Sequence, residues 1–252
     1  MNNKRGTQLI VVSFLLYGLF LLPSNYVSAN PILQSGTYIE LGGNGKLVID
    51  HASDAKLTFS MEIVRVNGHT CDLEGSIQDG HAILSSDGNS DENGNAVEPC
   101  FVLFTSTPDG VEVKARDARS CQRYCGSRAD LSETLYFMRP HEGCDTGSLA
   151  SSRKNFKRLY EGHKFSKAEA ILVPILANCK KTLEWFEEAR IRNDLAITQY
   201  HLGHTKDCLE TLNPLMSDAE VPDDELNFAP GDSSIYLPIL HSARTNIRLC
   251  KR

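Results

Sequence analysis

The stretch AKLTFSMEIVRV, residues 55–66, decides the fold of the first half of the chain. From Leu57 to Ile63 its apolar side chains occupy every second position and alternate with polar ones. Successive side chains of a strand point to opposite faces, so this alternation predicts a half-buried antiparallel strand. Similar short runs surround it: KLVID (46–50), TCDLEG (70–75), HAILS (81–85), CFVLFT (100–105) and GVEVKA (110–115).

Turn residues separate these runs, in GGNG (42–45), VNGH (66–69), QDGH (78–81) and TPDG (107–110). Asn-Gly and Asp-Gly pairs accept the positive φ angles of tight hairpins. Six to eight short strands in sequence predict an antiparallel β-meander, closed into a barrel or a sandwich. We therefore expect an α+β chain whose β-domain covers residues 30–149.

After residue 150 the apolar pattern changes to a helical period. Residues 153–179 and 192–216 align at a separation of 40, which pairs Tyr160 with Tyr200 and Leu172 with Leu212. A repeat of this length predicts stacked helix pairs in residues 150–252. The stretch SIYLPILHSARTNIRLC (234–250) predicts a closing helix.

The second repeat unit resembles the tetratricopeptide family. The resemblance rests on Leu195-Ala196, Gly203, Cys208, Leu212 and Pro214, and covers roughly 65 residues in two units. The chain departs from the family in its repeat of 40 residues, against 34, and in a proline expected inside each second helix. The resemblance implies protein docking through the helices, with a structural cover for the β-domain as the alternative.

The first 29 residues have the layout of a secretory signal peptide. Lys4 and Arg5 precede an apolar run over 9–22, and Val27-Ser28-Ala29 offers a cleavage site before Asn30. A retained anchor is the alternative, but this run of 14 residues is shorter than the roughly 20 that span a bilayer. We expect a mature chain of 252 − 29 = 223 residues in the periplasm or secreted, with no membrane association after cleavage.

The cysteine count predicts a disulfide framework, because exported chains oxidise their thiols. Five cysteines precede residue 150 and three follow it, so complete oxidation within one chain requires at least one bridge between the halves. The eight are Cys71, Cys100, Cys121, Cys125, Cys144, Cys179, Cys208 and Cys250.

The stretch CQRYCGSRADL (121–131) suggests a metal knuckle, a redox site or a structural staple. Zinc knuckles use closer pairs and need a second pair, which the chain lacks. If a helical turn ends at Gly126, the Cβ directions of Cys121 and Cys125 do not converge. We therefore expect a staple in which one cysteine reaches the sheet and the other the helical half.

The β-domain is strongly acidic. Residues 30–150 hold 18 acids and 9 bases, a net charge of −9, whereas residues 151–252 hold 14 acids and 15 bases. Nucleic acid is excluded as a partner because it requires clustered positive charge. An acidic face could steer a cationic protein; a merely solvated face is the alternative. The candidate binding residues here are Asp72, Glu74, Asp79 and Asp87.

The tetrapeptide SGTY (35–38) is similar to the Ser-Gly-x-Tyr loop of some bacterial periplasmic lysozyme inhibitors, which are small, acidic, disulfide-bonded β-proteins. The resemblance implies a binding role for Ser35 and Tyr38. It covers only the β-half, because those inhibitors have no counterpart of the helices.

Two stretches suggest metal sites. Asp87, Asn89, Asp91, Asn93, Asn95 and Glu98 match positions 1, 3, 5, 7, 9 and 12 of a calcium loop. Position 6 is Glu92 instead of glycine, which favours a solvated hairpin insertion. HLGHTKDC (201–208) has zinc-like spacing, but the repeat already assigns its glycine and cysteine to a turn and a helix contact. No cofactor is predicted.

Catalytic motifs are lacking: the chain has no G-x-S-x-G, H-E-x-x-H or phosphate-binding glycine loop. We therefore expect a non-enzymatic protein that binds and inhibits another protein, as lysozyme inhibitors or immunity proteins do. The alternatives are an interaction scaffold acting through the helices and a hydrolase with an unrecognised site.

Overall fold

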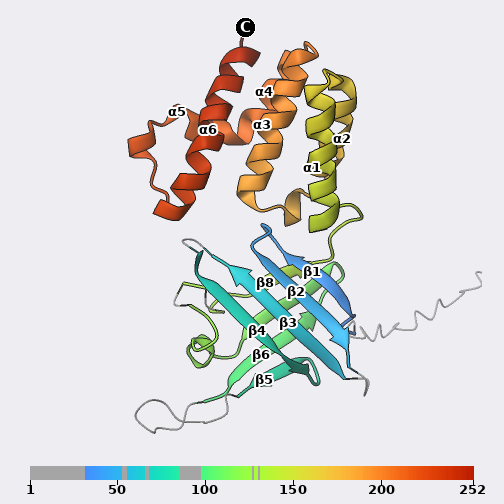
Figure 1. Cartoon of the computed structure of the whole chain (residues 1–252). Helices are drawn as coiled ribbons and strands as arrows, with labels where there is room; N and C mark the ends of the chain where they lie inside the picture. The colour runs from blue at the N-terminus through green and yellow to red at the C-terminus, as the bar shows by residue number, and fades with distance from the viewer. Residues whose placement is uncertain (1–31, 53–55, 66–67, 86–97, 127, 130) are drawn as a thin grey trace, which may run out of the picture. The chain divides into compact units, whose positions relative to one another are not determined.

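Eight strands in the described part of the chain form one antiparallel sheet that curls into a nearly closed barrel (Figure 1). The computed structural model describes residues 32–252 apart from 53–55, 66–67, 86–97, 127 and 130. The strands are β1 (Gly36–Glu40), β2 (Gly45–His51), β3 (Leu57–Val64), β4 (Thr70–Ile77), β5 (His81–Leu84), β6 (Cys100–Ser106), β7 (Gly110–Ala115) and β8 (Leu135–Met138).

The strand order β4-β3-β2-β1-β8-β7-β6-β5 is that of an up-and-down meander. β8 lies between β1 and β7, with Met138 opposite Ile39 and Phe137 opposite Val111. The two outermost strands, β4 and β5, meet at their hairpin through the bridge between Gln78 and His81. The predicted meander is confirmed, and its barrel form is the one adopted.

Side chains fill the barrel interior. Ile49, Ile63 and Val102 are fully buried, and the Phe59 and Phe104 rings from β3 and β6 meet edge to face at 4.8 Å. Every second residue points inward, as in β3, where Phe59, Met61 and Ile63 are buried and Ser60, Glu62 and Val64 are exposed. Because side chains fill the interior, a molecule that bound the barrel would contact its outer face.

A buried ion pair stabilises one end of the barrel. Two guanidinium nitrogens of Arg65 donate to the two carboxylate oxygens of Glu40 at 2.8 and 2.6 Å. The Arg65 and Glu40 side chains are only 23% and 9% exposed. Removing one partner would leave the other charge buried and uncompensated.

We therefore expect Glu40→Gln to lower the free energy of unfolding by about 3 kcal/mol. Urea denaturation measures this loss. The control is Asp117→Asn, which removes the exposed ion pair with Arg119 and is expected to cost less than about 0.5 kcal/mol. Equal effects of the two substitutions would contradict the role given to the buried pair.

The helical half contains two helix hairpins and a long closing helix. Its α-helices are α1 (Thr146–Glu161), α2 (Phe165–Asn178), α3 (Trp185–His201), α4 (Thr205–Leu212), α5 (Met216–Glu220) and α6 (Pro230–Cys250). The hairpin turns carry positive φ at His163 and Gly203, 40 residues apart. The repeat alignment thus corresponds to structurally equivalent turns, and the predicted helix pairs are confirmed.

One detail of the predicted repeat is wrong. Pro174 lies inside α2, but Pro214 lies in a 3-10 turn, Asn213–Leu215, because α4 already ends at Leu212. Within the described residues, no helix is long and apolar enough to cross a membrane. The predicted signal peptide lies outside the described residues.

All eight cysteines are paired, as predicted. The bridges are Cys71–Cys125, Cys100–Cys121, Cys144–Cys179 and Cys208–Cys250. Four disulfides indicate an oxidising environment. Cys144–Cys179 crosses residue 150, as the odd counts require, yet both cysteines pack in the helical core. The bridge therefore closes the helical half and does not tie it to the strands, contrary to our expectation.

Candidate functional site

The outer face of β2, β3 and β4 is the most acidic surface that the described strands build. Its outward residues form rows across the three strands: Lys46, Glu62 and Asp72 in one row, and Val48, Ser60 and Glu74 in the next. Asp50 belongs to the row beyond these. We call the residues Asp50, Glu62, Asp72 and Glu74 the acidic face; all four are exposed.

Two adjoining hollows cover this face. The first, of about 510 Å³, is lined by Lys46, Glu62, Asp72, Glu74 and Tyr124, among others. The second, of about 490 Å³, shares Val48, Ser60 and Glu74 with the first and extends to Asp50. The acidic face is therefore indented along the strands, a shape that an extended segment of a partner can occupy.

The charges on this face do not cancel. Four carboxylates line the two hollows, and among the described residues Lys46 is the only basic one that lines them. Glu62 and Asp72 stand directly opposite each other in the β3–β4 register. Lys46 stands on the other side of Glu62 in the β2–β3 register, so this row holds two acids against one base and keeps a net negative charge.

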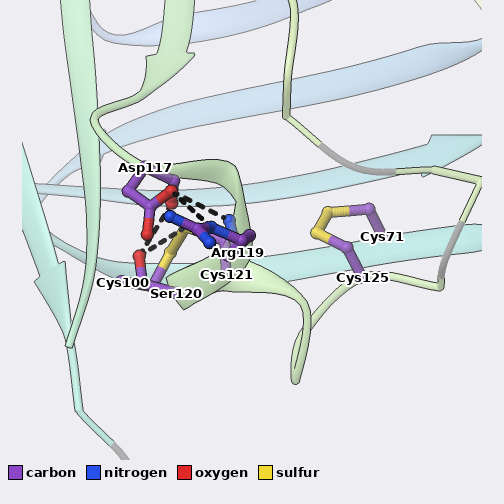
Figure 2. The surroundings of a disulfide bond; sticks show 7 residues. All are labelled: Cys71, Cys100, Asp117, Arg119, Ser120, Cys121 and Cys125. Carbon is purple, nitrogen blue, oxygen red and sulfur yellow. Dashed lines mark hydrogen bonds and ion pairs between the residues drawn. A yellow bond between two sulfur atoms is a disulfide. The ribbon is translucent and has the colours of Figure 1, made fainter. Parts of the chain in front are cut away.

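The cysteine-rich segment after β7 is joined to the sheet by two disulfides (Figure 2), and its Tyr124 lines the first hollow. Cys121 ends a 3-10 turn, Ala118–Cys121, and is bridged to Cys100 at the start of β6. Cys125 is bridged to Cys71 on β4. The Asp72 amide donates to the Tyr124 carbonyl at 3.3 Å, so the segment runs along the edge of β4 and holds Tyr124 beside Asp72.

These bridges show which of the three roles suggested for residues 121–131 the segment has. The stretch is a staple and its two cysteines have different partners, as predicted. The helical turn expected through Cys125 is wrong, because that residue lies in an extended bridge with Cys71. Both arms reach the sheet, whereas one had been expected to reach the helices.

Of the four acidic residues predicted to bind a partner, only two lie on the acidic face. Asp72 and Glu74 lie side by side on the acidic face, but Asp79 lies in the β4–β5 turn with φ 50°. Asp87 falls outside the described residues. Asp50 and Glu62 were missed, although their positions in the alternating runs place them outward from the same strands.

Ser35 and Tyr38 belong to a separate contact network. Tyr38 is buried, and its hydroxyl donates to the Gln34 carbonyl at 2.7 Å. The Arg139 guanidinium lies 4.9 Å from the centre of the Tyr38 ring and donates to the Ser35 carbonyl at 2.7 Å. In this structure the tetrapeptide anchors β1 to the residue that follows β8.

The described residues of the two predicted metal sites do not come together to hold a metal ion. Asp87, Asn89, Asp91, Asn93 and Asn95 of the calcium stretch lie outside the described residues, while Glu98 is exposed. Cys208 is bridged to Cys250, so its sulfur is not available to zinc. The described side chains include no group of three placed to hold a metal ion.

The helical half has a polar groove of about 420 Å³ between α1, α3 and α6. Arg153 of α1 lies 2.8 Å from a carboxylate oxygen of Asp194 and 3.3 Å from one of Glu187, both on α3. Burial raises the pKa of Asp194, although the neighbouring Arg153 opposes this shift. Asn193 and Asn246, which also line the groove, are hydrogen-bonded to each other.

The raised pKa of Asp194 sets the sign of a pH effect. The folded state holds this proton more tightly than the unfolded state, so the residue's contribution to stability is present below the unfolded pKa of about 3.9 and declines as pH rises through the folded value. We expect the free energy of unfolding of Asp194→Asn, minus that of the native protein, to increase between about pH 4 and pH 7, because only the native protein loses this contribution. Urea denaturation across this range measures it, with exposed Asp207→Asn as control; a difference that stays constant or falls with pH would refute the assignment.

Comparison of the chain with protein-family models, curated proteins and solved structures gives no match.

Proposed function

We propose that this chain is an exported binding module that captures a cationic protein through the acidic face and blocks its action. Lysozyme inhibitors and immunity proteins against secreted toxins act in this way. The observation that carries the proposal is the direct opposition of Glu62 and Asp72 across β3 and β4. Lys46 opposes only one of these two carboxylates, so the row keeps a net negative charge that a bound cation would balance.

Two further features support the proposal. The four disulfides fit an oxidising compartment such as the periplasm or the extracellular space. The stapled segment fixes Tyr124 beside the acidic face before a partner arrives. A surface ordered in advance loses less conformational entropy on binding, which favours affinity.

The test is affinity capture with the oxidised chain, residues 30–252, against exported and periplasmic proteins and a panel of lysozymes. We expect a stoichiometric cationic partner whose retention falls between low and moderate salt and whose activity falls on binding. The matched control bait is Asp72→Asn with Glu74→Gln, which should retain less of that partner. A partner held equally by both baits, or no partner at all, would contradict the proposal.

The polar groove between α1, α3 and α6 supports a second candidate, an interaction scaffold acting through tetratricopeptide-like helices. Its lining charges include both signs, from Arg153, Arg190 and Asp194, so binding there would depend less on the partner's net charge. Arg190→Ala is the discriminating bait. It should lose the partner only if the helical groove makes the contact.

A further inference from the structure

Another hollow, separate from the two on the acidic face and of about 500 Å³, is lined by exposed apolar side chains from three elements. Val64 of β3, Trp185 of α3 and Ile235 of α6 all line it and are 43%, 37% and 41% exposed. Large apolar residues exposed singly are ordinary, whereas three that line one hollow offer a partner a shared apolar surface. We call this the Trp185 hollow.

The indole of Trp185 is held on one side and open on the other. Its ring centre lies 4.7 Å from that of Tyr236 and 5.9 Å from that of Phe228. Trp185 is the first residue of α3, and the preceding Glu184 carboxylate caps that helix by accepting from the Phe186 and Glu187 amides. A tryptophan fixed in this way can bind without losing rotamer entropy.

The turn between β1 and β2 approaches the segment before α3 closely. The Gly42 amide donates to the Lys181 carbonyl at 2.9 Å. Gly43 has φ 76°, and a Cβ atom there would lie 2.2 Å from the Glu184 nitrogen. Only glycine fits this contact, which forms one wall of the Trp185 hollow.

Strand β3 makes the Trp185 hollow and the acidic face neighbours. Ser60, Glu62 and Val64 are successive outward residues of β3; the first two line the acidic hollow and the third lines the Trp185 hollow. Glu184 and Asp232 also line the Trp185 hollow, while its Arg65 is neutralised by the bidentate pair with Glu40. The remaining charged residues that line the Trp185 hollow in the described part of the chain, Glu184 and Asp232, therefore give it the same sign of charge as the acidic face.

We infer that the Trp185 hollow takes a large apolar side chain from the same cationic partner. The partner segment then has lysines or arginines along the acidic face and an aliphatic or aromatic anchor against Trp185. This inference rests on the proposed function and specifies the chemistry of the partner segment. Charge on the acidic face governs how fast the partner associates, and the anchor governs how slowly it leaves.

The probes are two synthetic peptides, Lys-Lys-Lys-Phe-Lys-Lys-Lys and the same peptide with glycine in place of phenylalanine. Trp185 is the only tryptophan in the chain, so its emission reports directly on the hollow. We expect the phenylalanine peptide to shift this emission and to bind about 10- to 100-fold more tightly than the glycine peptide, because one buried aromatic side chain contributes that much.

Two conservative variants keep the test independent of folding. Val64→Thr and Ile235→Thr each remove apolar surface from the hollow and should abolish most of the preference for phenylalanine. Leu103→Thr, at a residue 44% exposed on β6, is the matched control and should leave the preference unchanged. Equal affinity for the two peptides, or emission that neither peptide shifts, would overturn the inference.

The same titrations separate this inference from the proposed function. If both peptides bind equally and Glu74→Gln weakens both, the acidic face attracts cations and the anchor is wrong. If phenylalanine is preferred and Glu74→Gln changes nothing, the anchor stands and cationic capture is wrong.

Discussion

Reversing the charge of Glu62, Asp72 and Glu74 to lysine is expected to slow association with the cationic partner by about 10- to 100-fold at low salt. These carboxylates line one hollow on the outer face of β3 and β4, where their fields add. Diffusing partners are attracted to this face, so the effect lies in the association rate. Stopped-flow measurements at several salt concentrations show it directly.

The matched control reverses three exposed acids of the helical half, Asp207, Asp224 and Glu225. It changes the net charge of the chain by the same amount at a different place. At 0.1 M salt, where exposed charges farther apart than about 10 Å are screened, we expect this control to slow association much less than the acidic-face variant does. Equal slowing by the two triple variants would show that net charge alone is responsible.

Replacing Cys71 and Cys125 together with serine is expected to lower the free energy of unfolding by about 4 kcal/mol. The bridge joins residues separated by 54 positions, so its loss greatly increases the conformational freedom of the unfolded chain. It also releases the segment that holds Tyr124 beside Asp72. Denaturant unfolding of both proteins under oxidising conditions measures the difference.

The comparison is the double variant of Cys100 and Cys121, which are separated by only 21 positions. The shorter separation predicts a smaller loss, about 3 kcal/mol. Only the Cys71–Cys125 variant is expected to bind the partner more weakly. A loss below about 1 kcal/mol for that variant would contradict its role as a staple.

Strands with clear alternation could be predicted from the sequence. Leu57 to Ile63 point alternately into and out of the barrel, and the Asp79-Gly80 turn has the positive φ angles expected of its residue types. β8 was missed because all four residues of Leu135–Met138 are apolar, so the segment shows no alternation of apolar and polar side chains. Its partners β1 and β7 are far away in the sequence, so local patterns cannot show where it pairs.

The sequence predicted that the candidate site is acidic, but it did not predict all of the residues that form it. An excess of acids over residues 66–113 pointed to Asp72 and Glu74. The alternation of inward and outward residues along β2 and β3 would have added Asp50 and Glu62. The opposition of Glu62 and Asp72 depends on the β3–β4 register, which residue composition does not fix. The Trp185 hollow depends on packing between distant segments and left no local signal.

The central claim is that the acidic face contacts the partner. Covalent labelling of carboxylates, read by mass spectrometry with and without the captured partner, tests it most directly. We predict that the partner protects Glu62, Asp72 and Glu74 from labelling, while exposed Asp207 and Glu210 on α4 react as before. Protection confined to carboxylates of the helical half, with Glu62, Asp72 and Glu74 still fully reactive, would contradict the account.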